Sequence, residues 1–448
     1  MNILKIGIIV FLFCCCNLFS LAEGDEKRTF SLEEAQNFAI ENNLNIKNAE
    51  ADVRIARKKI WEITAFGLPQ VNGSVNYTDN LSLATVLIPN FFGGNPDEMV
   101  EVQFGTQHNA SASLTADQLI FSGSYIVGLM AAKVYKQISQ QNLEKTEIDI
   151  KELVTRNYYL VLLTEETKKI LIKNYQNTQK TYLETRAMFE QGFVEETDVD
   201  QLKVTLTTLD NSINSMERQA KLSRNMLKFQ MGLDLGVHVS LSDSLYGILE
   251  KINLQLIAAN DFNIDNNIDY NIIETQVELA SLDLKRQKTE YLPNLSVMYS
   301  NNWNAMRDKF SFFDTDEKWY RSEMLGFTLN VPVFSSGSKR SKISQKRIEL
   351  EKVIENQKLV RQSLEMENQQ ARFDYNTALE KYMSENENVK LAGRILEKTR
   401  IKYKNGMASS FELIQANNQY LQTESNLTSA MIELLNVKTR LDKIMNRL

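Results

Sequence analysis

The residue types that most often do chemistry in enzymes are scarce in this chain of 448 residues. Its only two histidines, His108 and His238, lie far apart in the sequence. General acid–base catalysis and zinc binding both depend heavily on histidine, so we expect neither a histidine-based catalytic site nor a His-ligated metal site. Hydrolytic enzymes are therefore not expected. Because the sequence offers no other catalytic constellation, we predict a protein that is not an enzyme, with no metal and no cofactor.

The three cysteines are adjacent, at positions 14 to 16 of an apolar N-terminal stretch. Lys5 precedes this stretch, and Ser20-Leu21-Ala22 has the small-x-small form of a signal peptidase site, which predicts a secretory signal peptide at residues 1–22. Two alternatives stay open. One is a membrane anchor helix, although the stretch is shorter than the ~20 residues that a span needs. The other is lipoprotein processing at Cys15, three residues after Leu12.

The overall composition excludes some classes of protein and favours long helices. The chain has 51 basic and 57 acidic residues, and no Lys- or Arg-rich run stands out, so nucleic-acid binding is not expected. Only 5 Pro and 17 Gly interrupt it, which favours long uninterrupted elements. After residue 22 there is no apolar run of about 18 residues, so a secreted form of this protein could enter a membrane only by strands.

The chain contains an internal duplication. Asn42-Asn43-Leu44 and Pro69 recur as Asn266-Asn267-Ile268 and Pro293, and Thr185-Arg186 with Gly192 recurs as Thr399-Arg400 with Gly406. Phe121-Ser122-Gly123-Ser124 likewise resembles the stretch at 334–338. We predict a first repeat at 23–234, a linker at 235–262 and a second repeat at 263–448.

Both repeats carry the apolar spacing of a coiled coil. In the first repeat the spacing of 4 and 3 runs through Leu202, Leu206, Leu209, Ile213, Met216 and Ala220. In the second it runs through Ala416, Tyr420, Thr423, Leu427, Ala430 and Leu434. A further seam precedes it, at Ala371, Tyr375, Ala378, Tyr382, Val389, Ala392, Leu396 and Tyr403. Many of these residues are Ala or Tyr, which suits closely packed helices in a curved wall.

Four stretches alternate between apolar and polar residues and predict strands, at about 69–80, 107–120, 293–304 and 322–333. Their length of about ten residues is typical of outer-membrane barrel strands. The alternative is two half-buried hairpins of a soluble domain. Aromatic residues near the strand ends favour the membrane interpretation, at Tyr77, Phe91, Phe92, Tyr299, Trp303, Trp319 and Tyr320.

Each repeat is thus predicted to contain an opening helix, a strand hairpin and a long helical hairpin. The opening helices are expected at about 31–66, with a Ser31/Glu34 capping box, and at about 264–290. The hairpins are expected to turn at Gly192 and Gly406, after a helix that is on the order of 100 Å long. Four strands cannot close a barrel, so several subunits must combine their strands. Two subunits would give a filled barrel, and three would leave room for a channel.

With these features the chain resembles the TolC-like outer-membrane factor family. The resemblance rests on the opening at 31–43, the two strand starts "LPQV" and "LPNL", the stretch at 331–342, and the paired tips "FEQGFVEETDV" and "YKNGMASSFEL". It implies a mainly α fold with a small β part, built as a homotrimer. Twelve strands would form a β-barrel in outer-membrane lipid, and twelve helices would form a coiled-coil tunnel across the periplasm.

The resemblance also implies a function and partners. The chain would be the passive exit duct of a tripartite efflux pump or type I secretion system, opened by a periplasmic adaptor and an inner-membrane transporter. The docking tips would be Gly192 with Phe193 and Gly406 with Met407. Tyr403 would belong to the network that closes the entrance, although Ala408 stands where the family has an arginine.

The family's acidic constriction is matched by Glu412 and, in the first repeat, by Asp198, whereas the second ring position is Gln415. Three Glu412 carboxylates near one axis would attract cations. Glu412 could equally be a charged residue on the solvent-exposed face of a helix. The acidic residues near Gly192 could simply lie at an exposed helix N-terminus, where the helix dipole favours negative charge. The alternative function is a periplasmic coiled-coil structural or adaptor protein without a pore.

Overall fold

The computed structural model describes residues 27–89, 99–252 and 262–448. The predicted signal peptide, Cys15, Phe91, Phe92 and part of the predicted linker lie outside the described residues. The chain divides into two compact units, which we describe separately. Unit 1 contains the chain up to Ala49, Leu143–Ile268 and Arg361–Leu448, and unit 2 contains Glu50–Asn142 and Asp269–Val360.

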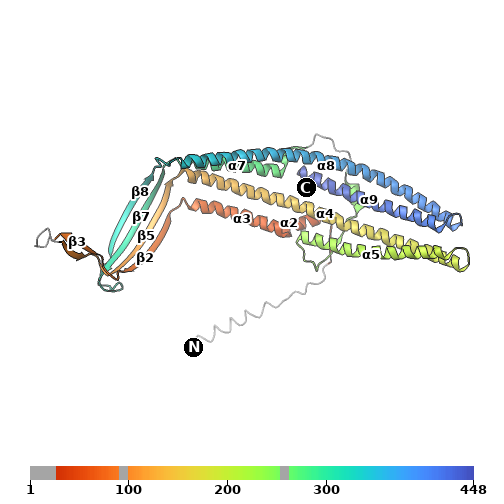
Figure 1. The fold of residues 1–448 in the computed structure, drawn as a ribbon, viewed down its shortest axis with the longest axis horizontal. Helices are drawn as coiled ribbons and strands as arrows, with labels where there is room; N and C mark the ends of the chain where they lie inside the picture. Colours follow the sequence, from red (N-terminus) through yellow and green to blue (C-terminus); the bar gives the residue numbers. More distant parts are fainter. Residues whose placement is uncertain (1–26, 90–98, 253–261) are drawn as a thin grey trace, which may run out of the picture. The chain divides into compact units, whose positions relative to one another are not determined.

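Helices make up most of the described chain, and the remaining elements are strands (Figure 1). The helices are α2 (Leu32–Asn42), α3 (Leu44–Ala65), α4 (Gly123–Glu190), α5 (Glu196–Met231), α6 (Leu245–Lys251), the short 3₁₀ helix η1 (Ile264–Asn266), α7 (Ile268–Thr289), α8 (Ser338–Lys404) and α9 (Ser410–Ile444). The predicted class, mainly α with a small β part, is confirmed. Within the described ranges, no helix has the length and apolar character needed to cross a membrane.

The strands fall into three sheets. They are β1 (Lys27–Phe30), β2 (Gln70–Asp79), β3 (Thr85–Pro89), β4 (Met99–Gln103), β5 (His108–Phe121), β6 (His238–Leu241), β7 (Asn294–Arg307) and β8 (Tyr320–Asn330). β2, β5, β7 and β8 form one antiparallel sheet in that order. They occupy the four stretches in which alternation predicts strands.

The opening helix of the first repeat differs from the single helix expected over 31–66. The Ser31/Glu34 capping box is present, but the helix stops at Asn42 and a new one starts at Leu44. The break occurs because Asn43 is extended, with φ −62° and ψ 132°, and its side-chain oxygen accepts a hydrogen bond from the Asn45 amide at 2.8 Å. In the second repeat η1 and α7 flank Asn267, which is extended in the same way.

These two asparagines show that the duplication extends to tertiary contacts. Asn43 Nδ2 donates to the carbonyl of Gln230 at 2.7 Å, and Asn267 Nδ2 donates to the carbonyl of Ile444 at 3.1 Å. Both side chains are buried. In each repeat the opening segment is therefore fastened to the end of the returning helix by an equivalent bond.

The main sheet of unit 2 has two chemically different faces. The register places Val71, Val75, Leu114, Tyr299, Leu325, Phe327 and Leu329 on one face. It places Asn72, Asn76, Ser111, Thr115, Asn302, Ser322 and Thr328 on the other. Several apolar side chains are strongly exposed within the chain, such as Val75 at 79% and Phe327 at 70%. Among the described strands, β2 and β8 are each paired on one side only.

Two smaller sheets do not follow from the sequence patterns. β1 pairs in parallel with β6, and β3 pairs with β4 in the segment between β2 and β5. In unit 1 the Tyr158 hydroxyl, fully buried, lies 3.0 Å from the Phe30 carbonyl and 2.9 Å from Asp243 Oδ2. The Tyr158 hydroxyl therefore ties β1 to α4 and to the segment after β6.

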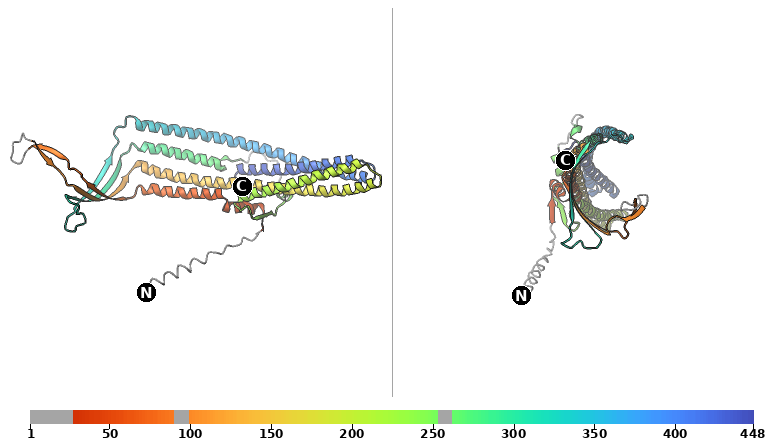
Figure 2. Two further views of the ribbon diagram at one scale, coloured as in Figure 1. Left: turned by 60° about the horizontal axis from the view of Figure 1, so that its bottom comes forward. Right: turned by 90° about the vertical axis from the view of Figure 1, so that its left-hand side faces the viewer.

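The helices of unit 1 pack through the predicted seams. α5 runs back along α4, and α9 runs back along α8 (Figure 2). Leu202, Leu209 and Ala220 are buried on α5, and the equivalent residues Ala416 and Leu434 are buried on α9. Ala371, Tyr375 and Ala378 of the third seam have at most 2% of their surface exposed. The heptad spacing therefore identifies the packed faces of these helices.

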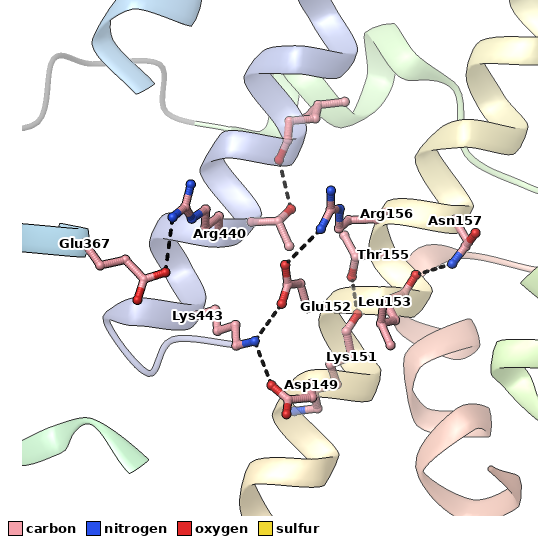
Figure 3. Close-up of polar contacts among 12 residues, drawn as sticks. Asp149, Lys151, Glu152, Leu153, Thr155, Arg156, Asn157, Glu367, Arg440 and Lys443 are labelled. Carbon is pink, nitrogen blue, oxygen red and sulfur yellow. Dashed lines mark hydrogen bonds and ion pairs between the residues drawn. The ribbon is translucent and has the colours of Figure 1, made fainter. Parts of the chain in front are cut away.

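A polar cluster joins the end of α9 to α4 in unit 1 (Figure 3). The Lys443 ammonium lies 2.6 Å from Asp149 and 2.8 Å from Glu152, and Glu152 also lies 3.5 Å from Arg156. Burial alone would lower the pKa of Lys443, but its hydrogen bonds to Asp149 and Glu152 outweigh this effect and raise the pKa. The cluster therefore holds Lys443 in its charged form.

We expect Lys443→Met to lower the thermal unfolding midpoint by about 2–4 °C, because it leaves two neighbouring carboxylates without their shared cation. Adding Glu152→Gln should recover part of that loss. The control is Lys381→Met, which removes an exposed pair with Glu433 at 2.7 Å and should have little effect. Thermal denaturation followed by circular dichroism measures all three variants, and equal midpoint shifts for Lys443→Met and Lys381→Met would contradict this role.

Candidate functional site

The two tips of the helical hairpins in unit 1 are built alike. α4 ends at Glu190 and α8 ends at Lys404, and the glycine two residues later has a left-handed backbone, with φ +80° at Gly192 and +70° at Gly406. Phe193 N donates to the Met188 carbonyl at 2.9 Å, and Met407 N donates to the Lys402 carbonyl at 2.8 Å. This is the Schellman arrangement, in which glycine avoids the cost of a left-handed side chain.

Apolar side chains are exposed on both tips. Phe193 is 79% exposed, Met407 is 67% exposed and Phe411, at the start of α9, is 64% exposed. A Cβ atom added at either glycine would meet no other atom within 4 Å. The predicted docking residues therefore lie on open surface.

Glu412 has a local role that the resemblance did not imply. Its carboxylate accepts a hydrogen bond from the Ser409 amide at 2.7 Å, and its own amide donates to Ser409 Oγ at 3.2 Å. This capping box starts α9, and Glu412 remains exposed. The Ser-x-x-Glu spacing at 409–412 is the sequence signal that predicts it.

Asp198 connects the two tips of the chain. One carboxylate oxygen accepts from the Glu195 amide at 3.3 Å, at the start of α5. The other accepts from the hydroxyl of Ser410, which is buried at the start of α9. The candidate site therefore includes Ser410, which the sequence patterns did not single out.

Tyr403 makes a second bond between the hairpins. Its hydroxyl lies 2.7 Å from Thr185 Oγ1 on α4, and both residues are buried. Burial raises the pKa of Tyr403, and the nearby charges of Asp198 and Glu184 raise it further against the opposing effect of the Thr185 bond. Tyr403 is therefore a neutral hydrogen-bonding group. The resemblance implied Tyr403 and the duplication included Thr185, but neither predicted that the two side chains meet.

The structure thus brings together Asp198 with Ser410 and Tyr403 with Thr185, but it does not join Gln415 to them. Gln415 is exposed, and its side chain has no hydrogen-bond partner within the described part of the chain. Across those residues there is also no cluster of three or more side chains suited to holding a metal ion. The tips contain hydrogen bonds, charges and exposed apolar groups, which suit docking and gating.

Comparison with known proteins agrees with this arrangement. The model of the outer membrane efflux protein family matches residues 37–233 and 264–447, one segment for each repeat. No curated protein matches the sequence significantly.

Several solved structures share the fold. CusC has 16% sequence identity and a TM-score of 0.74, with 95% of this chain and 95% of that chain covered. MtrE of Neisseria gonorrhoeae has 15% identity and a TM-score of 0.73, with 92% and 88% covered. CmeC of Campylobacter jejuni has 16% identity and a TM-score of 0.70, with 95% and 90% covered. The family model covers most of both repeats, and the chain belongs to the outer membrane efflux protein family, whose members are non-enzymatic outer-membrane channels with a periplasmic helical tunnel.

Proposed function

We propose that three copies of this chain form the exit duct of a tripartite efflux pump or type I secretion system. The observation that carries the proposal is the main sheet of unit 2, which has an exposed apolar face, a polar face and an unpaired edge on β2 and on β8. Unpaired strand edges are costly in lipid, so β8 of one copy would pair with β2 of the next. Three copies would then close a cylinder of twelve strands, with the apolar face toward lipid and the polar face inside.

The duct itself would be passive. A periplasmic adaptor would dock on the tips around Gly192, Phe193, Gly406 and Met407, and an inner-membrane transporter would supply the energy. The exposed apolar groups on these tips support this role, because such groups on a polar surface favour protein contacts. Opening would loosen the two bonds that join the hairpins near their tips, Thr185–Tyr403 and Asp198–Ser410.

Cross-linking tests the docking role directly, because all three cysteines of the sequence lie at 14–16, within the predicted signal peptide. A single cysteine at Phe193 or Met407 should cross-link in cells to one periplasmic partner, and the same change should reduce export. A cysteine at Phe229, which is 70% exposed on α5 away from the tip, serves as the control. Equal cross-linking from all three positions would contradict docking at the tips.

Glu412 would contribute to the cation preference of the channel. We expect Glu412→Gln to lower the ratio of cation to anion permeability toward one, because the amide oxygen can still cap α9 while the charge is removed. Reversal potentials across a planar bilayer in a KCl gradient measure this ratio. A ratio equal to that of the wild type would remove Glu412 from the constriction.

A further inference from the structure

The two tips of one chain carry opposite charge. Residues 186–200, around Gly192, contain five carboxylates and one arginine. The equivalent residues 400–414, around Gly406, contain three basic residues and one carboxylate. A partner that contacts both tips therefore meets an acidic surface and a basic one.

A small groove lies beside the basic tip in unit 1, with a volume of about 100 Å³. It is formed by α4, α8 and the start of α9, and it is lined by Asn177, Lys180, Thr181, Glu184, Arg400, Tyr403, Lys404 and Leu413. Three of these side chains are cationic and one is anionic. The groove therefore has an excess of positive charge.

The cations of the groove are poorly neutralised by the protein. Lys180 and Lys404 have no carboxylate within 4.0 Å among the described residues, and both are exposed. Arg400 has one weak pair, at 3.8 Å from Glu397 on its own helix. Other lysines of α8 do find close partners, such as Lys390 at 2.7 Å from Glu387. Anions are thus favoured in this groove over cations or neutral groups.

We infer that the groove receives a carboxylate side chain from the docking adaptor, an inference that rests on the proposed function. A volume of about 100 Å³ holds a carboxyl group with its methylenes but not a folded segment. The same tip exposes Met407 and Phe411, which a protein surface covers and a free anion does not. Tyr403 lines the groove, so the bound carboxylate lies beside the Thr185–Tyr403 bond.

Charge reversal with a matched control tests this inference. Lys180→Glu combined with Lys404→Glu should reduce export more than tenfold, because like charges at an interface cost several kcal/mol. The control is Lys221→Glu combined with Lys398→Glu, two exposed residues that lie outside both tip segments and do not line the groove. The control should export at close to the wild-type level. If the reversed variant fails to assemble, Lys180→Gln combined with Lys404→Gln takes its place in the comparison, because it removes the two charges without reversing them.

Suppressor selection and binding then identify the occupant. Adaptor variants that restore export to the reversed chain should replace an acidic residue of the adaptor with Lys or Arg. Binding of the purified adaptor, the partner identified by the tip cross-link, should weaken at least tenfold for the groove variants and remain unchanged for the control. Equal binding by the groove and control variants would overturn the inference. Equal binding is also the result expected if the groove holds only a free anion. If the wild-type chain itself neither exports nor binds an adaptor, the proposed function fails, independently of the groove.

Discussion

Channels formed by the Thr185→Val/Ser410→Ala double variant are expected to open on the order of tenfold more often than wild-type channels. The two changes remove the two side-chain bonds that join the hairpins near their tips, Thr185–Tyr403 at 2.7 Å and Ser410–Asp198. Each such hydrogen bond contributes about 0.5–1.5 kcal/mol, and a total of about 1.4 kcal/mol changes an equilibrium tenfold. Single-channel recording in planar bilayers measures the open fraction and the conductance.

Thr428→Val is the matched control for this variant. Thr428 is buried on α9, and its hydroxyl donates only to the Glu424 carbonyl of its own helix, at 2.8 Å. Its removal should leave the open fraction unchanged. A double variant that stays as closed as the wild type would show that these bonds hold the hairpins of one chain together without closing the entrance.

Gly406→Val is expected to reduce export about tenfold or more while the trimer still assembles and inserts. The cause is the backbone, since φ is +70° and an added Cβ meets no atom within 4 Å. A β-branched residue in this conformation costs on the order of 1–2 kcal/mol or more, so the tip would change its shape. Export is measured in cells, with heat-resistant trimers on gels as the check on assembly.

Gly406→Asn separates backbone conformation from side-chain size. Asparagine adopts the left-handed conformation more readily than other residues, so this variant should retain most of the export. Loss of export in both variants would indicate that the docking surface tolerates no side chain at this position. Normal export by Gly406→Val would contradict docking at this tip.

The sequence predicted the elements whose spacing is regular. The heptads around Leu202 and Ala416 identified the packed faces, and the recurrence of Asn43 at Asn267 identified the duplication, because each pattern reflects burial of side chains at fixed intervals. The pairing of β1 with β6 was not predictable in this way. Each strand has four residues, and the two are joined through residues such as Thr29 and Ser240, which lie 211 positions apart.

The candidate site was predicted only in part. The glycine turns were predicted from the sequence, whereas Phe193, Met407 and Glu412 were located by resemblance. The capping bond of Glu412 with Ser409 could be predicted from the Ser-x-x-Glu spacing. The bonds of Asp198 to Ser410 and of Tyr403 to Thr185 could not be predicted, because they join helices from different repeats whose relative rotation depends on the whole bundle.

Membership of the outer membrane efflux protein family removes one of the functions that the sequence left open. A periplasmic coiled-coil protein without a pore explains the heptads, but that alternative is wrong, because the family consists of outer-membrane channels. The four amphipathic strands of unit 2 have no role in a protein of that kind.

The central claim is that three chains combine their strands into one channel. The most direct test is planar-bilayer conductance of the detergent-extracted protein, with the oligomeric mass determined on the same sample. The account predicts a trimer that gives small, cation-selective current steps, which multivalent cations block. A monomeric protein that is soluble without detergent and gives no current steps would contradict it.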